Sequence, residues 1–85
     1  MERRRNRKQR WMQQHSRQRA WERYGIDLDK SLRRRIIQDI QNGRSTPIKT
    51  QSNRVTHHSI EVEGKRVRVV YDKRRKDIVT VLPQK

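Results

Sequence analysis

The 85-residue chain has no cysteine and no phenylalanine, and it contains only three glycines, two prolines and nine acidic residues. Without cysteine it can form neither a disulfide framework nor a thiolate zinc site, and it lacks a cysteine nucleophile. The glycines form no phosphate-binding loop, and the carboxylates are too scattered for a paired-carboxylate site. No apolar run approaches the roughly 20 residues of a membrane span, and the first residues lack the apolar stretch of a signal peptide. We therefore expect no membrane partner, no metal and no cofactor.

Positive charge is what the chain has in excess. Lysine and arginine number 24, which gives a formal net charge of +15. Such a charge favours a polyanionic partner, either RNA or DNA. Leucine, isoleucine and valine supply only 17 of the 85 residues, close to the lower limit for a highly charged chain that folds on its own. The length allows one small domain with a modest core.

The aliphatic residues are confined to the stretch between Ile26 and Leu82. We therefore expect a flexible basic arm at 1–10, followed by a single domain at 11–83. The predicted elements are helices at about 11–24 and 29–42 and strands at about 54–62, 66–71 and 78–82, with a weaker strand at 48–51.

Local signals support these elements. Gly25 is the residue type expected just after a helix, and an apolar stripe from Leu32 to Ile40 has helical spacing. After Pro47 the chain becomes rich in β-branched residues, which is typical of strands. Helix, helix and then consecutive strands predict an α+β fold, with two N-terminal helices packed on one face of a 3–4-stranded antiparallel sheet behind a basic N-terminal arm.

The first helix has a weakly apolar side. At 100° per residue, Ala20, Trp21 and Tyr24 gather on one side, and we expect these three residues to hold the helix to the domain. The other side carries Trp11, His15, Arg19 and Glu22.

The arm is an arginine-rich segment followed by Trp11. Such a segment either folds on nucleic acid and supplies phosphate contacts from a helix, or stays a disordered tail that adds non-specific affinity. Trp11 could stack on an unpaired base. The arm weakly resembles the arginine-rich RNA-binding peptides of lambdoid phage N antiterminators. The expected nucleic-acid contacts are Arg3, Arg4, Arg5, Arg7, Lys8, Arg10, Trp11, Arg23, Arg33, Arg34, Lys73, Arg74 and Arg75.

His15 is the most informative single residue, because it shares a helical side with Arg19. A neutral imidazole can take a proton from a ribose 2′-hydroxyl near pH 7, and a nearby arginine can hold the phosphate. Any basic helix offers such pairs, so a solvated histidine is the alternative interpretation.

The strands carry further candidates with two interpretations each. His57 and His58 point to opposite faces of the sheet, so that one could approach a site, or both could be ordinary strand residues. Arg68 lies on a face that is either solvated or part of a site.

The last strands add two hydroxyl groups. Thr80 is expected on the face of Ile78 and Leu82, where it is either a satisfied core group or a phosphate-binding donor. Tyr71 lies at a strand end. It is either a cap of the core or a functional group that stacks on a ligand or donates a proton to the ligand.

Residues 15–26 resemble the first-helix signature of a small bacterial and phage family of domains. That signature reads His-Ala-x-x-Arg-x-x-x-Arg-Gly-Ile, and this chain has one additional residue before the glycine. The segments 64–72 and 78–83 resemble the last two strands of the same family, which belongs to the barnase–EndoU–colicin–RelE-like (BECR) superfamily of metal-independent ribonucleases and toxins. The matching helix positions are His15, Arg19, Arg23, Gly25 and Ile26.

This resemblance implies a cleft between the first helix and the sheet, with catalytic positions at His15, Arg19, Arg68 and Thr80. It implies RNA cleavage by attack of the 2′-hydroxyl, in the cytoplasm of a bacterium or a phage-infected cell. An acidic antitoxin or inhibitor would be a natural partner.

Two further hypotheses compete with a small metal-independent endoribonuclease. The first is a non-catalytic RNA- or DNA-binding protein on the same scaffold. The second is a regulator that docks on a ribosome or transcription complex through its arginine-rich surface. Net charge supports all three equally, because affinity for phosphate carries no information about chemistry.

Overall fold

The computed structural model describes residues 2–83 and confirms the α+β fold. Two helices precede a four-stranded antiparallel sheet, whose strands follow one another in the order β1-β2-β3-β4. The weaker strand that the sequence predicts at 48–51 is present as the edge strand β1. The elements are α1 (Glu2–Tyr24), α2 (Lys30–Gln41), β1 (Thr46–Thr50), β2 (Val55–Val62), β3 (Lys65–Asp72) and β4 (Asp77–Leu82).

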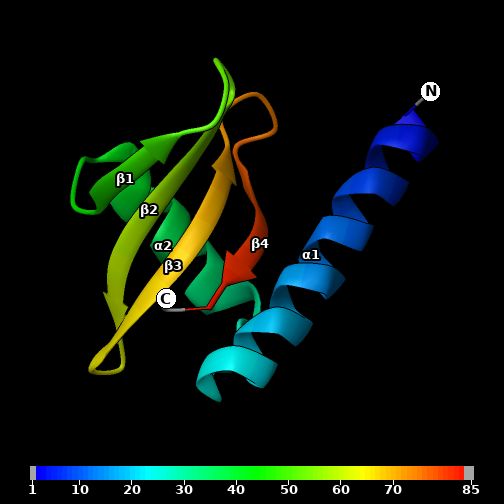
Figure 1. The fold of residues 1–85 in the computed structure, drawn as a ribbon. Coiled ribbons are helices and arrows are strands. Elements are labelled where there is room, and N and C mark those ends of the chain that lie inside the picture. The colour runs from blue at the N-terminus through cyan, green and yellow to red at the C-terminus, as the bar shows by residue number, and fades with distance from the viewer. Residues whose placement is uncertain (1, 84–85) are drawn as a thin grey trace.

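The core lies between α2 and one face of the sheet. Asp29 caps α2 by accepting a hydrogen bond from the backbone N–H of Leu32 at 2.9 Å. The apolar stripe of α2 then faces the sheet, with Ile36 only 2% exposed. Figure 1 shows α2 behind the sheet. The core residues are Ala20, Ile26, Leu28, Ile36, Ile60, Val62, Val67, Val69, Ile78 and Val81.

The helix α1 lies beside the edge strand β4 (Figure 1). Its contact stripe is Met12, Ser16 and Ala20, all at most 2% exposed. At the end of the helix, the Tyr24 hydroxyl donates to the carbonyl oxygen of Leu82 at 2.6 Å and accepts from the backbone N–H of Arg68 at 3.3 Å. Within the described residues, α2 leaves the opposite face of the sheet uncovered, and α1 borders that face along β4. We call this face the open face.

Two features of α1 differ from the sequence-based expectation. The helix begins at Glu2, so residues 2–10, expected as a flexible arm, continue the helix. This segment consists almost entirely of good helix formers and contains neither glycine nor proline. Trp21, expected to anchor the helix, is 64% exposed. Small side chains at Ser16 and Ala20 let the helix backbone approach β4 closely, where an indole would not fit.

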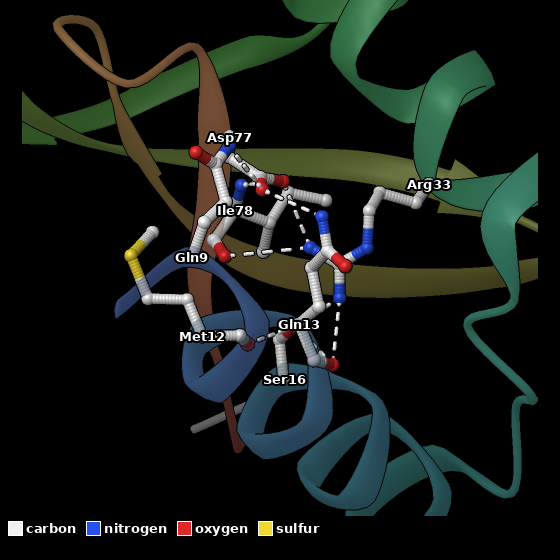
Figure 2. Close-up of polar contacts among 7 residues, drawn as sticks. All are labelled: Gln9, Met12, Gln13, Ser16, Arg33, Asp77 and Ile78. Atoms are coloured by element: carbon white, nitrogen blue, oxygen red, sulfur yellow. Dashed lines mark hydrogen bonds and ion pairs between the residues drawn. The ribbon is translucent and has the colours of Figure 1, made fainter. Parts of the chain in front are cut away.

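A buried ion pair joins α1, α2 and β4 (Figure 2). The Arg33 guanidinium lies 2.9 Å from the Asp77 carboxylate, and both side chains are less than 8% exposed. Arg33 also donates to the carbonyl oxygen of Gln13 at 2.9 Å and to the Ser16 hydroxyl. Asp77 accepts from the side-chain amide of Gln9 at 2.9 Å. The pair therefore has further hydrogen-bond partners on α1, as a buried charge requires.

Arg33 consequently differs from its neighbours in the arginine cluster. The sequence predicts that it contacts nucleic acid, but its guanidinium is enclosed by protein groups and is not available to a phosphate. Burial lowers the pKa of Arg33, and the Asp77 carboxylate opposes this effect. Arg34 and Arg35 remain exposed.

Replacing Arg33 with alanine leaves the Asp77 carboxylate buried and without its cation. We expect Arg33→Ala to lower the free energy of unfolding by about 3–5 kcal/mol in urea titrations, whereas the exposed control Arg34→Ala changes it by less than about 0.5 kcal/mol. The double variant Arg33→Met/Asp77→Asn leaves no unpaired charge and should recover part of the loss. Equal effects of Arg33→Ala and Arg34→Ala would contradict a structural role for the ion pair.

Candidate nucleic-acid interface

A cavity of about 410 Å³ opens on the open face, between the first half of α1 and the sheet. We call it the cleft. One wall is formed by α1, and the floor by side chains of β2, β3 and β4 that share the open face in the strand register. Its lining residues are Trp11, Met12, Gln51, Arg54, Val55, His57, Val70, Asp72, Arg75, Val79, Thr80 and Leu82.

The mouth of the cleft is basic. A second cavity of about 470 Å³ is lined by Gln9, Arg54, Arg74 and Arg75. Arg54 and Arg75 line both cavities, so the two hollows adjoin at these side chains. The guanidinium groups of Arg54, Arg74 and Arg75 therefore lie at the mouth of the cleft.

One buried carboxylate, Asp72, organises this mouth. It is 4% exposed, and it pairs with Arg54 at 3.1 Å and with Arg75 at 3.6 Å. It also accepts from the backbone N–H groups of Arg74 at 2.9 Å and Arg75 at 3.2 Å. Burial alone would raise the pKa of Asp72, but the hydrogen bonds from Arg54, Arg75 and Arg74 outweigh it and lower the pKa. A guanidinium has five donors, so both paired arginines keep donors for phosphate oxygens.

Trp11 and His15 form a stacked pair at the rim of the cleft. Their ring centroids are 4.8 Å apart and their planes differ by 9°. Trp11 is 55% exposed although it lines the cleft, so one large aromatic surface is available to a ligand. His15 lies beside the cleft through this stack, although it does not itself line the cavity. Arg19 follows one turn later, where it donates to Glu22 at 2.9 Å.

Arg68 and Thr80 lie on the open face. In the strand register Thr80 is opposite Val70, and Arg68 is opposite Leu82, so both residues are next to lining residues of the cleft. Thr80 lines the cleft itself. The expectation that Thr80 shares a face with Ile78 is wrong, because a β-bulge in β4 turns Ile78 into the core while Thr80 stays on the open face.

Tyr71 lies apart from the other predicted catalytic residues. It is 5% exposed on the core side of the sheet, where its hydroxyl accepts from Gln41 at 3.0 Å. Its ring meets His58 edge-on, with centroids 6.3 Å apart. His58 in turn is hydrogen-bonded to Ser45 and Thr56, each at 2.8 Å. These contacts indicate a structural role for both rings.

His57 belongs to the cleft, as the alternation of β2 allows. It is 8% exposed, and its Nε2 lies 2.9 Å from the Oε1 atom of Gln51. Burial lowers the pKa of His57, and the cations of Lys49 and Arg68 lower it further. Arg54 also belongs to the site, but its partner Asp72 lies 18 residues away, and no local pattern in the sequence joins them.

The remaining basic candidates are dispersed. Arg10 and Arg34 line hollows on the α2 side of α1, away from the cleft. Arg23 and Lys73 are exposed and line none of these hollows. The side chains of the first five arm candidates lie outside the described part of the chain. These residues are Arg3, Arg4, Arg5, Arg7 and Lys8.

Comparisons with protein families, with curated proteins and with solved structures find no match. The resemblance to the BECR superfamily therefore stays a prediction. Within residues 2–83 no helix is long and apolar enough to cross a membrane, and no group of three or more metal-ligating side chains is found.

Acidification should destabilise the fold through the two strand histidines. Burial, followed by nearby positive charge, lowers the pKa of both His57 and His58 below 6.5. The unfolded chain therefore binds more protons just below pH 6.5, so the free energy of unfolding falls as the pH drops through this range. Asp72, with a pKa below 3.8, stays ionised there.

We expect a lower urea midpoint at pH 5 than at pH 7.5, and a smaller difference between the two in His57→Asn. The same pH difference in the variant as in the wild type would exclude His57 as a source of the effect.

Proposed function

We propose that this protein binds nucleic acid, with an unpaired nucleotide in the cleft and the flanking phosphates at its basic mouth. The observation that carries this proposal is the position of Trp11. A half-exposed indole forms one wall of a cavity whose mouth is lined by Arg54, Arg74 and Arg75. Stacking platforms next to a positive groove are the common solution for binding single strands.

The cleft also has the chemical character that a base needs. Val55, Val70 and Leu82 give it apolar walls, whereas His57 and Thr80 place polar groups on the floor. Its volume falls in the range of small-molecule sites. A base can therefore stack on Trp11 and still reach hydrogen-bonding groups.

The excess charge of the chain supports the same proposal. A net charge of +15 favours association with any phosphate backbone. Such a protein finds its partners in the cytoplasm of a bacterium or a phage-infected cell, as free RNA or as part of a ribosome or transcription complex. An acidic protein inhibitor would compete for the same basic mouth.

The two exposed tryptophans provide a matched test. Trp11→Ala removes the stacking platform, so we expect a loss of affinity for a fluorescent single-stranded oligonucleotide of roughly 5- to 150-fold in anisotropy titrations. Trp21→Ala removes an equally exposed indole that lies beside Asp27 and away from the cleft, and its affinity should match the wild type. Equal losses in both variants would contradict binding in the cleft.

The same titrations report the electrostatic contribution. If six to ten phosphates are neutralised, affinity should fall by about 10³–10⁵ between 50 and 200 mM salt in both variants and in the wild type. A shallow salt dependence would contradict binding to a polyanion.

Cleavage of RNA is a second candidate function of the same cleft. It is favoured by the placement of His15 on Trp11 at one rim, with Arg68 and Thr80 on the open face. In such a reaction the ribose 2′-oxygen bonds to the adjacent phosphorus while the bond from phosphorus to the 5′-oxygen breaks. The 2′-hydroxyl proton passes to a base, and the 5′-oxygen takes up a proton. The products are a 2′,3′-cyclic phosphate and a 5′-hydroxyl, with His15 as acid or base and Arg68 on the phosphate.

Incubation with total RNA in EDTA tests this second candidate. We expect cleavage that leaves cyclic phosphates, with a rate about 10²–10⁴-fold lower in His15→Ala and unchanged in Trp21→Ala. RNA that stays intact with the wild-type protein, or cleavage that is unaffected by His15→Ala, would leave nucleic-acid binding as the function.

A further inference from the structure

Two buried polar atoms on the open face have no hydrogen-bond partner among the described residues. They are Nδ1 of His57 and Nε of Arg68. Folded proteins pair the great majority of their buried polar atoms, so an unpaired one calls for an explanation. Here both lie on the same face of the sheet, in neighbouring strands.

The two residues are diagonal neighbours. His57 on β2 is opposite Val70 in the register, and Arg68 precedes Val70 by two residues on β3. Residues in this relation project from the same face and are within reach of long side chains. The charge of Arg68 lowers the pKa of His57, which is consistent with this proximity.

The hydrogen-bonding character of each atom follows from its surroundings. Nε2 of His57 lies 2.9 Å from Oε1 of Gln51, which can only accept, so this contact is a hydrogen bond in the tautomer with the ring proton on Nε2. In the neutral ring Nδ1 is then a bare acceptor. Nε of Arg68 is always a donor. The two unpaired atoms are therefore one acceptor and one charged donor, on neighbouring strands of the open face.

A ligand that satisfies both atoms needs a hydrogen-bond donor next to an acceptor, and an anionic acceptor suits the charged guanidinium best. RNA has this combination at every linkage, because the ribose 2′-hydroxyl adjoins the 3′-phosphate. DNA has the phosphate but lacks the hydroxyl.

We propose that His57 and Arg68 form a ribose subsite. In it, Nδ1 of His57 accepts a hydrogen bond from the 2′-hydroxyl, and the guanidinium of Arg68 binds the adjoining phosphate. The protein thereby selects RNA over DNA. This inference rests on the proposed function, because it assumes that nucleic acid enters the cleft.

The test uses three single-stranded oligonucleotides of one sequence: RNA, DNA and 2′-fluoro RNA, which lacks the hydroxyl donor. Anisotropy titrations with the full chain at one fixed salt concentration compare their affinities, and gels check that the RNA stays intact. We expect the wild type to bind RNA about 10-fold more tightly than the other two.

Variants at His57 test the acceptor. His57→Val removes it and should bring the RNA-to-DNA affinity ratio close to one, because RNA affinity falls more than DNA affinity does. His57→Asn places an amide oxygen near the position of Nδ1 and should retain most of the RNA preference. Circular dichroism spectra of both variants establish that they are folded.

A matched pair of arginines tests the donor. Arg66 is exposed on the same face of the same strand, so Arg66→Ala removes the same charge outside the subsite. We expect Arg68→Ala to reduce affinity for RNA and DNA several-fold more than Arg66→Ala does. Equal losses would overturn the assignment of Arg68.

The outcomes separate this inference from the proposed function. Equal, Trp11-dependent binding of RNA and DNA by the wild type overturns the ribose subsite and leaves nucleic-acid binding intact. An RNA preference that survives His57→Val overturns the role of His57. Binding of neither oligonucleotide overturns both proposals.

Discussion

The buried pair of Arg33 and Asp77 fixes the arrangement on which the candidate site depends. Its charges come from α2 and from the first residue of β4, and its remaining hydrogen bonds come from side-chain and backbone groups of α1 and from the backbone of Ile78. Removing either charge leaves the other one buried and unpaired, which is why the three elements hold together as one unit. In a chain with few aliphatic residues, this polar junction connects α1, α2 and β4 in addition to the small apolar core.

The junction also determines which face of the sheet stays open. Gln9 and Gln13 bind Asp77 at the start of β4, and Tyr24 binds Leu82 at its end, so α1 is held along the whole strand. A helix held at the edge of a sheet covers neither face completely. The cleft is the consequence, because α1 holds Trp11 next to side chains of the strands. Such preorganisation would reduce the entropy lost when the proposed ligand binds.

Local patterns in the sequence predict where the helices and strands lie, but they do not predict which side chains pair between them. The stripe of α2, the turns and the alternation that puts His57 and His58 on opposite faces are all readable within a few residues. The roles of Ser16 and Arg33 are not, because a serine against a strand and a buried arginine depend on Asp77, 44 residues from Arg33. Trp21 was assigned to the interface on hydrophobicity, but the close approach of α1 to β4 requires small side chains there.

The buried carboxylates Asp72 and Asp77 reduce the positive charge that the arginines present at the surface. Arg33 is enclosed with Asp77 and cannot meet a phosphate, and the single charge of Asp72 offsets part of the charge of Arg54 and Arg75. The count of cations therefore overstates the positive charge that a phosphate would meet. Asp72 also determines where two of these cations lie, because it holds the guanidinium groups of Arg54 and Arg75 at the mouth of the cleft. Phosphate contacts orient a nucleic acid without identifying it. In the proposed complex, discrimination would then come from uncharged or unpaired groups inside the cleft and beside it, such as Trp11, His57 and Thr80, together with the buried Nε donor of Arg68.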